Sequence, residues 1–172
     1  MANANDPIVI SGAGLWNPDY TISNDELVLA YNGYAEKFNA ENAAGIEQGE
    51  VEAKPLSSAE FINKASGINN RYIYRKEGVL DINRMRPILE VRSNEEVSHQ
   101  AEMAVNAAKK ALEAANKKPE DVDVVIVACA YTQRSYPALA IEVQAELGIE
   151  GFGFDMLVAC SAATFALQRA YE

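Results

Sequence analysis

Residues 151–167 have the sequence Gly-Phe-Gly-Phe-Asp-Met-Leu-Val-Ala-Cys-Ser-Ala-Ala-Thr-Phe-Ala-Leu, and this stretch decides the fold. Its first part is apolar apart from one aspartate and predicts a buried strand. Its last part is a run of small and apolar residues that predicts a closely packed helix. Between them a tight turn carries Cys160. The stretch therefore predicts a strand, a turn with one thiol, and a helix.

Cys160 is the candidate nucleophile of the chain. A helix N-terminus offers unpaired backbone N–H groups and a positive dipole end, which favour the thiolate, the form of cysteine that attacks carbon. The small neighbours Ala159, Ser161 and Ala162 leave room for a substrate. The alternative is that Cys160 packs as a small apolar residue, because free cysteines are often buried. Cys129 ends an apolar run with no helix signal directly after it, so we assign it to the core.

Upstream of this stretch, helices and strands alternate. Ser93 and Glu96 form a capping-box pattern that predicts the start of a helix, and alanines then recur at helical spacing as far as Ala115. Residues 122–129 are apolar and mostly β-branched, as expected for a parallel strand covered on both faces. A further helix is expected at residues 137–148. This order predicts an α/β fold with a mostly parallel sheet built from βαβ units.

The N-terminal segment suggests a strand and a glycine turn. Ile8-Val9-Ile10 predicts a first strand, which ends at Gly12 and Gly14. The pair of glycines lacks the third glycine and the immediate helix of a dinucleotide-binding loop. We therefore do not assign a nucleotide site to it.

Helix-capping residues, and the alternation of polar and apolar residues, predict further helices and strands before residue 92. The expected segments are a loop at 15–22, a helix from residue 25 capped by Ser23 or Asn24, a helix at 59–65 capped by Ser57 or Ser58 and followed by Gly67, and a short strand at 71–76. In the segments 39–56 and 77–92 the apolar residues do not recur at the spacing of a helix or a strand. We interpret both as insertions, the first irregular and the second a loop or short helix.

Composition excludes several classes of function. The 172-residue chain has a net charge of −10 and an isoelectric point of about 4.6, which argues against nucleic acid or an anionic membrane surface as the main partner. It has two widely spaced cysteines and one histidine, so neither a disulfide framework nor a zinc site is indicated. The first residues lack a signal-peptide pattern and no apolar run is long enough to span a bilayer. A cytoplasmic location is expected.

The last predicted helix has no ending signal. Residues 168–172 contain no glycine, proline or capping residue, and residues 162–167 are apolar on nearly all sides. A helix of this kind needs cover on every face, and the chain is too short to supply two covering layers. We therefore expect the chain to be the N-terminal part of a larger protein.

Six short motifs in the chain match the motifs of a known protein family. The motifs are Ser66-Gly67-Ile68-Asn69-Asn70-Arg71-Tyr72-Ile73, Val125-Ile126-Val127-Ala128, Tyr136-Pro137, Leu147-Gly148-Ile149, Phe154-Asp155 and Ala159-Cys160-Ser161-Ala162. In this order and spacing they resemble 3-oxoacyl-(acyl-carrier-protein) synthase III, a family of condensing enzymes in the thiolase superfamily. The cysteine block is the most specific match. The resemblance covers most of the chain but only the N-terminal half of the family fold.

The resemblance implies a thiolase-like layered α/β/α/β/α fold of two similar halves, of which this chain holds one. It implies that Cys160 accepts an acyl group from an acyl-CoA, and that a malonyl group on acyl carrier protein then decarboxylates and attacks the acyl-cysteine. The product would start or feed fatty acid synthesis. The backbone N–H of Cys160 is implied as an oxyanion donor. A homodimer without a metal or bound redox cofactor is also implied.

The family's catalytic histidine and asparagine belong to its C-terminal half, so the isolated chain is expected to be inactive. His99 is not a substitute, because it falls in the first turns of a helix that precedes the βαβ unit presenting Cys160. We expect His99 to lie at the surface.

Two departures from the family pattern concern the acyl donor. Where the family carries a tryptophan that stacks on the CoA adenine and an arginine near its phosphates, this chain has Phe61 and Ala65. Loss of the stacking face and of the fixed cation favours a different donor, such as one with a longer acyl chain. Phe61 is thus one candidate substrate-binding residue.

Tyr136 is the second candidate substrate-binding residue. It falls where the family places an aromatic residue that reaches across a dimer interface into the partner's acyl pocket. The alternative is an aromatic side chain in a loop before a proline. The basic residues at 71–92 could meet an acidic carrier protein, but acidic residues interrupt them, which favours a solvated face.

Alternatives of other kinds remain open. A degradative thiolase or a CoA-adding synthase would keep the fold and use other residues in the C-terminal half. A non-catalytic partner subunit would only dimerise and shape a pocket, although an intact cysteine at the turn disfavours this interpretation.

Overall fold

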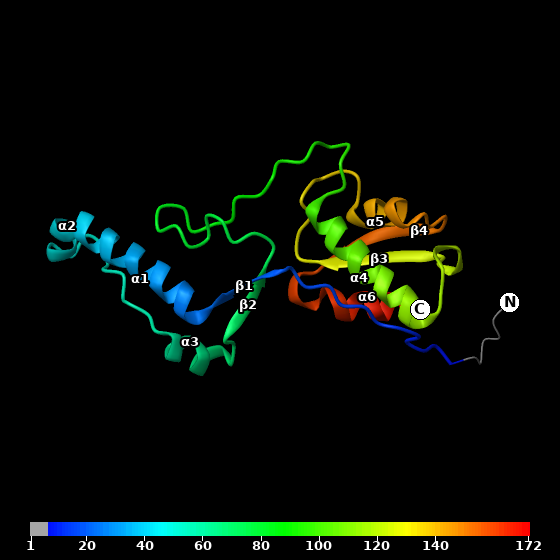
Figure 1. The fold of residues 1–172 in the computed structure, drawn as a ribbon, viewed down its shortest axis with the longest axis horizontal. Coiled ribbons are helices and arrows are strands. Elements are labelled where there is room, and N and C mark those ends of the chain that lie inside the picture. The colour runs from blue at the N-terminus through cyan, green and yellow to red at the C-terminus, as the bar shows by residue number, and fades with distance from the viewer. Residues whose placement is uncertain (1–6) are drawn as a thin grey trace. The chain divides into compact units, whose positions relative to one another are not determined.

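The computed structural model describes residues 7–172, which form two compact units. Unit 1 consists of the N-terminal segment as far as Trp16 together with Arg92–Glu172, and unit 2 is Asn17–Val91. Figure 1 shows the helices and strands of both. Each unit has its own pair of strands, parallel in unit 1 and antiparallel in unit 2.

Unit 1 is built on the parallel pair of β3 (Val124–Cys129) and β4 (Phe152–Leu157). The register runs from Val124 opposite Phe152 to Cys129 opposite Leu157. Helix α5 (Leu139–Leu147) connects the two strands and ends at Gly148, which adopts the left-handed conformation at φ 71°. The predicted parallel βαβ unit is therefore confirmed.

Helices cover both faces of this strand pair (Figure 1). Helix α4 (His99–Ala115) and α5 share one face, where a buried core packs against alternate residues of β3. Helix α6 (Ala162–Tyr171) lies on the other face, beside the residues of β3 that alternate with them. The core residues are Ala101, Val105, Leu139 and Val143, with Val125, Val127 and Cys129 packed against them.

The predicted first strand is wrong. Ile8, Val9 and Ile10 are extended but form no strand, and their side chains are 61–81% exposed. Among the described residues these three find no neighbouring strand to pair with. Gly12 and Gly14 instead allow close passage along α4, because an added Cβ on either would lie within 2.6 Å of a carbonyl oxygen of that helix.

Helix α4 begins later than predicted. Its cap is Ser98, whose hydroxyl accepts a hydrogen bond from the Ala101 N–H at 3.2 Å. The Ser93 N–H does donate to the Glu96 carboxylate, at 2.7 Å, but the turn that they form ends before the helix. The Ser98 N–H donates to Glu142 of α5 at 2.8 Å, a contact that no local pattern could indicate.

The expected surface position of His99 is also wrong, because His99 is only 5% exposed. Its backbone N–H donates to the Gln133 side chain at 3.0 Å, and the preceding Ser98 is fully buried. The start of α4 is therefore packed beneath the loop that follows β3 rather than facing solvent.

Unit 2 pairs β1 (Tyr20–Ser23) with β2 (Asn70–Ile73). Strand β2 lies where a strand was predicted, whereas β1 falls in the expected loop at 15–22 and extends one residue beyond it. A strand of four residues with little apolar alternation gives almost no sequence signal, which explains the omission.

Three helices complete unit 2: α1 (Asn24–Glu41), α2 (Ala43–Glu47) and α3 (Ala59–Ser66). Ser23 caps α1 in a reciprocal box with Glu26, Ser58 caps α3, and Gly67 ends α3 at φ 71°. These predicted caps are confirmed. The prediction that the segment 39–56 is irregular is partly wrong, since this segment contains the end of α1 and all of α2.

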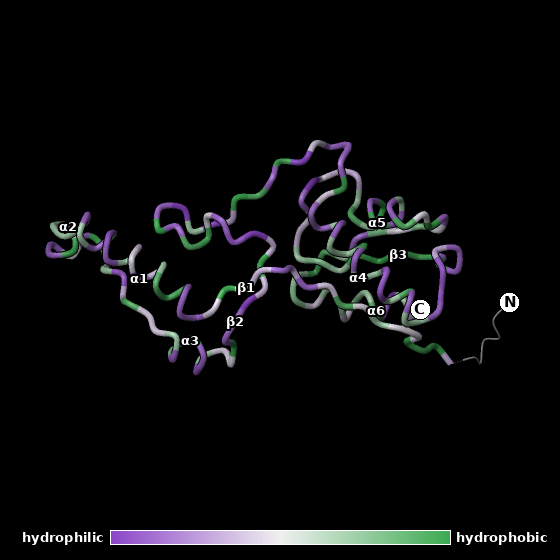
Figure 2. The backbone as a smooth tube through the Cα atoms, viewed as in Figure 1, coloured by the Kyte–Doolittle hydropathy of each residue, from purple (hydrophilic) through white to green (hydrophobic). Residues whose placement is uncertain are grey.

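The segment 77–92 forms turns and no helix. The Arg86 N–H donates to the Gly78 carbonyl at 3.2 Å, and the Ile88 N–H to the Glu77 carbonyl at 2.9 Å. Figure 2 shows that β3 is uniformly apolar, whereas α1 alternates between polar and apolar residues. Within residues 7–172, none of the helices combines the length and the apolar character needed to cross a bilayer.

Candidate active site

The turn after β4 exposes Cys160. A single 3-10 turn, Ala159–Ser161, joins β4 to α6, and Cys160 is its central residue. The Ser161 N–H closes the turn by donating to the Val158 carbonyl at 3.0 Å. The thiol therefore lies at the predicted junction of strand and helix, open to solvent at the end of the parallel strands.

Ala159, the residue before Cys160, has an unusual backbone conformation. Its φ is 45°, in the left-handed region that residues with a Cβ rarely adopt. The cost is about 1–2 kcal/mol, and such residues gather where function requires a fixed geometry. The sequence did not indicate this, because alanine carries no signal for a positive φ.

Cys129 has contrasting surroundings. It is half-buried at the end of β3 and packs against the core cluster, so its assignment to the core is confirmed. Burial, followed by the negative charge of Asp155, raises the pKa of the Cys129 thiol. Cys129 is thus held toward the protonated form, which is the less nucleophilic one.

Asp155 fixes the start of α5 from the neighbouring strand. Its two carboxylate oxygens accept hydrogen bonds from the Leu139 and Ala140 N–H groups, both at 2.8 Å. The N-cap residue of α5, Ala138, offers no capping side chain of its own. Asp155 was predicted only as part of the family motif, although a lone carboxylate in an apolar strand is a signal for such a capping role.

Tyr136 projects from the loop between β3 and α5 and is 87% exposed. The loop beneath it is anchored by Arg134, whose guanidinium donates to the Asn94 carbonyl at 3.1 Å and lies 3.7 Å from the Glu142 carboxylate. The side chains of Arg134 and Glu142 are 13% and 8% exposed. The aromatic ring is therefore presented to solvent on a firmly held loop.

Phe61 belongs to unit 2. It lies on α3, is 65% exposed, and borders an apolar pocket of about 690 Å³. Ala65 lies one turn further along the same helix and is also exposed. Cys160 and Tyr136 belong to unit 1, so the structure places the candidate residues in two separate units.

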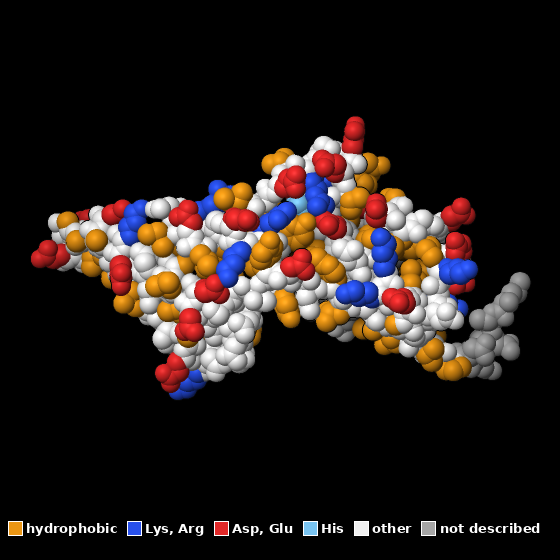
Figure 3. Space-filling view, viewed as in Figure 1, with side chains coloured by type: hydrophobic (Ala, Val, Ile, Leu, Met, Phe, Trp, Pro, Cys, Tyr) orange, Lys and Arg blue, Asp and Glu red, His pale blue; other side chains and the backbone are white. Residues whose placement is uncertain are grey.

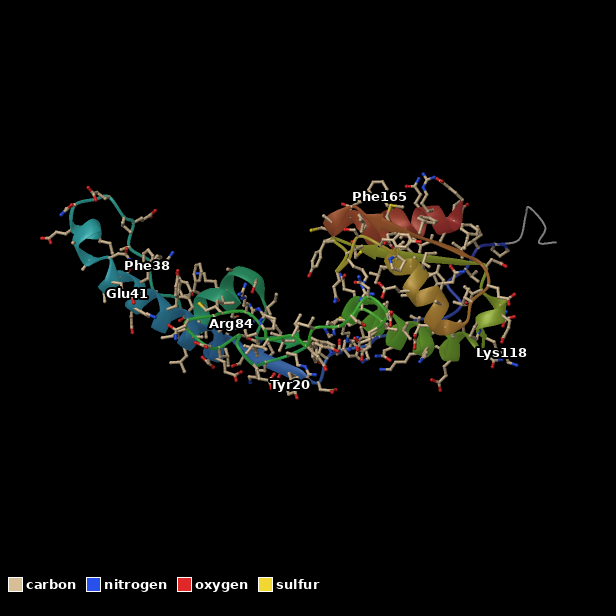
Figure 4. All side chains as sticks on the ribbon, turned by 90° about the horizontal axis from the view of Figure 1, so that it is seen from above. Tyr20, Phe38, Glu41, Arg84, Lys118 and Phe165 are labelled. Atoms are coloured by element: carbon tan, nitrogen blue, oxygen red, sulfur yellow. The ribbon has the colours of Figure 1, made fainter. Side chains whose placement is uncertain are left out.

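A second hollow, of about 1150 Å³, lies in unit 1 along α6. Its walls include Val124, Ile126 and Phe154 of the strands and small residues of α6. Phe165 of α6 is 45% exposed and points away from β3 (Figure 4), and Leu167 is 61% exposed. The apolar character of α6 is thus left uncovered by the described residues.

On the face of unit 2 that Figure 3 shows, charged groups do not form a single patch. Acidic and basic side chains are intermixed on the face of unit 2 seen in Figure 3. Lys76 of this unit pairs with Glu26, and Lys37 with Glu41 at 3.8 Å. Within the described part of the chain, no three histidine, cysteine or acidic side chains gather as they would around a metal ion.

Comparisons with known proteins identify relatives of this chain. No protein-family model matches it. The β-ketodecanoyl-[acyl-carrier-protein] synthase of Pseudomonas aeruginosa is 52% identical over 141 residues, which is 82% of this chain and 40% of that protein. A β-ketoacyl-[acyl-carrier-protein] synthase III of a Chelativorans species is 32% identical over 122 residues, 70% of this chain and 32% of the relative.

A solved structure supports the same relationship. The 3-oxoacyl-[acyl-carrier-protein] synthase III of Aquifex aeolicus superposes with a TM-score of 0.60 at 27% identity, covering 94% of this chain and 38% of that protein. The predicted thiolase-like α/β fold is thereby confirmed for the part present. The chain spans well under half the length of each of these relatives.

Proposed function

Because the chain is related in sequence and fold to the N-terminal half of the 3-oxoacyl-(acyl-carrier-protein) synthase III family, we propose that it is part of an acyltransferase of that type. In this proposal Cys160 takes an acyl group from an acyl-CoA, and the acyl-enzyme condenses with malonyl-acyl carrier protein. The observation that carries it is the exposed thiol at the turn between β4 and α6.

The chemistry proceeds in two transfers. The Cys160 thiolate attacks the thioester carbonyl of the donor, a new C–S bond forms, and CoA leaves as its thiolate. The malonyl group then loses carbon dioxide, and the resulting carbanion attacks the acyl-cysteine carbonyl. The cysteine thiolate leaves, and the 3-oxoacyl product remains on the carrier protein.

Local geometry supports this role for Cys160. The left-handed Ala159 and the closed 3-10 turn fix the sulfur at the start of α6. We propose that the Cys160 backbone N–H donates to the oxyanion of each tetrahedral intermediate. A histidine and an asparagine outside this chain would stabilise the carbanion and transfer protons, so the chain alone is expected to turn over no substrate.

The donor is proposed to be a medium-chain acyl-CoA. The Pseudomonas aeruginosa relative is named for a ketodecanoyl product, which has ten carbons, two more than the acyl group that enters the condensation. Phe61 and Ala65, in place of a large stacking face and a cation, support a donor that is bound less through its nucleotide. Tyr136 is proposed to line the acyl pocket of a partner subunit in a homodimer.

The proposal also covers the location of the enzyme, the rest of the protein and the absence of a cofactor. We place the enzyme in the cytoplasm, with the C-terminal half of the same protein packed over α6 and without a metal or bound redox cofactor. The segments at 39–56 and 77–92 are proposed as insertions relative to the family.

Acylation of Cys160 tests the proposal. Full-length protein is incubated with octanoyl-CoA, digested, and examined by mass spectrometry. We expect an octanoyl thioester on the peptide that contains Cys160 and none on the peptide that contains Cys129. The Cys160→Ser variant should lose condensation activity by about a thousandfold or more, since the covalent route is removed, whereas Cys129→Ala should retain it within a few fold.

Two results would contradict the proposal. One is full condensation activity in Cys160→Ser, which would remove the nucleophile from the mechanism. The other is a protein that never acylates at Cys160 although it dimerises, which would favour a non-catalytic partner subunit.

A further inference from the structure

The apolar pocket of unit 2 is lined by residues of α1, of α3, of the segment before α3 and of the turns at 77–92. Leu27, Val28 and Tyr31 come from α1, Phe61 and Ile62 from α3, and residues 55–58 close it between the two helices. Met85, from the turns at 77–92, completes the lining. Its volume of about 690 Å³ lies within the range of small-molecule sites. We refer to it as the α1–α3 pocket.

Several polar groups at the lining are already engaged within the protein. The Tyr31 hydroxyl donates to the Pro55 carbonyl at 3.0 Å, and the Ser58 hydroxyl accepts the Phe61 N–H at 3.1 Å. Asn32 of α1 bridges both the N–H and the carbonyl of Ser57, at 2.9 and 3.0 Å. A ligand would therefore meet mainly apolar surface, which favours an aliphatic group over a sugar or a base.

Met85 provides an independent indication that the pocket is functional. Its φ is 50°, a left-handed conformation that is unfavourable for a residue with a Cβ. The Met85 N–H is held by the Asp81 carbonyl at 2.8 Å, and the turn thus keeps the thioether at the pocket. Methionine side chains adapt their shape to different apolar ligands.

Two cations are neighbours in sequence of the pocket residue Met85. Arg84 and Arg86 flank Met85 in the chain, and among residues 7–172 neither forms an ion pair. The Arg84 guanidinium donates to the carbonyl groups of Arg86 and Pro87, at 3.2 and 3.5 Å. An apolar pocket that includes Met85, with a cation on either side of it in the chain, favours an amphiphile with an anionic head.

We infer that the α1–α3 pocket binds the aliphatic chain of an acyl compound, with the anionic end of that compound near Arg84 and Arg86. The choice of an acyl compound rests on the proposed function, whereas the pocket itself involves no residue of the Cys160 turn. The compound has two possible sources, a free fatty acid or the acyl group of an acyl-CoA.

Binding is tested in full-length protein that carries Cys160→Ser, so that no acyl transfer occurs. Isothermal titration with octanoate, dodecanoate and their CoA thioesters measures affinity directly. We expect affinity to rise with chain length, because each added methylene removes more apolar surface from water. Equal binding of acid and thioester identifies the chain alone as the ligand, and binding of the thioester only identifies the donor as its source.

Matched variants locate the binding. Leu56→Glu places a charge at the pocket rim and should weaken affinity at least about tenfold. Leu29→Glu makes the same change on α1, at a side chain that is 79% exposed and does not line the pocket, and should leave affinity unchanged. Met85→Gly should weaken binding about threefold while raising the melting temperature, since glycine relieves the left-handed backbone.

The inference fails if none of the ligands binds, or if Leu56→Glu and Leu29→Glu bind them equally well. Equal binding by the two variants contradicts this inference alone, because the measurement uses no reaction at Cys160. Absence of all binding, octanoyl-CoA included, would contradict the proposed donor as well. Conversely, binding at the pocket with no acylation of Cys160 in the unmodified protein would retain this inference and overturn the proposed enzyme.

Discussion

Unit 1 and unit 2 are stabilised by different kinds of interaction. Most fully buried apolar residues belong to unit 1, where they form a core between α4, α5 and β3. Unit 2 buries few apolar side chains, namely Ile22, Ala30 and Ala35. It relies instead on side-chain amides that hydrogen-bond the backbone of the returning segment, as Asn32 does with Ser57 and Asn39 with Lys54.

This difference suits the two proposed roles. A nucleophile must be held at a fixed position, and the Cys160 turn lies between a paired strand and a packed helix. A pocket for aliphatic chains of different lengths can be built on elements that adjust, and the α1–α3 pocket is bordered by a loop held by hydrogen bonds. Substitutions that remove one stabilising interaction at a time, first in unit 1 and then in unit 2, test this contrast.

The largest expected effect is in unit 1, from Asp155→Ala. This substitution leaves two N–H groups at the start of α5 without the carboxylate, and hydrogen bonds to a charged group are among the stronger ones. We expect the free energy of unfolding to fall by about 3 kcal/mol, measured by urea denaturation. A loss below about 1 kcal/mol would show that α5 is held by the core alone.

Asp155→Asn provides the matched control. It retains the shape of the side chain but removes the charge that, after burial, raises the pKa of Cys129. The pKa of Cys129 should therefore fall. The pH dependence of Cys129 alkylation, measured in a Cys160→Ala background, should move to lower pH. An unchanged profile would show that burial alone sets the reactivity of Cys129.

Local signals in the sequence predicted local structure well. Ser58 and Gly67 marked both ends of α3, the apolar run ending at Cys129 predicted β3, and the small residues around Cys160 predicted the strand-to-helix junction. Each of these rests on residues within one or two turns of one another. The position of Cys160 could therefore be predicted, and with it the part of the site on which the proposed chemistry depends.

Structure that depends on distant residues was predicted poorly. Helix α4 begins at His99 because Glu142 accepts the Ser98 N–H from another helix, whereas the local pattern at Ser93 indicated an earlier start. Likewise, Asp155 caps α5 from β4, which follows the helix, and lies 15 and 16 residues after the two N–H groups that donate to it. The α1–α3 pocket also joins residues 27–31, residues 55–62 and Met85, which are separated in sequence, so no single motif predicts it.

The intermediate effect is expected in unit 2, from Asn32→Ala. The change removes two hydrogen bonds to Ser57 between uncharged groups, so unfolding should become easier by about 1–2 kcal/mol. Amide hydrogen exchange at residues 56–58 should accelerate, whereas exchange in β3 should not. Glu36→Ala, at an exposed position of the same helix, should change stability by less than about 0.5 kcal/mol. Equally faster amide exchange in both units would contradict the proposal that these hydrogen bonds stabilise unit 2 and not unit 1.

The smallest effect is expected from Glu26, which links α1 to the strand pair of unit 2. Hydrogen bonds from Lys76 and from the Ser23 N–H lower the pKa of Glu26 from 4.5 to about 2. Because the folded pKa lies below the unfolded value, the ionised carboxylate stabilises unit 2 above about pH 4.5, and this contribution is lost as the pH falls toward about 2. Amide exchange in α1 should therefore differ between the unmodified protein and Glu26→Gln at pH 6, and the difference should shrink steadily below pH 4.5.

The Glu26 carboxylate is partly exposed, so solvent screens its charge, and high salt should reduce the same difference in amide exchange. A difference that persists unchanged at pH 2 would mean that the shape of the Glu26 side chain, rather than its charge, holds the start of α1.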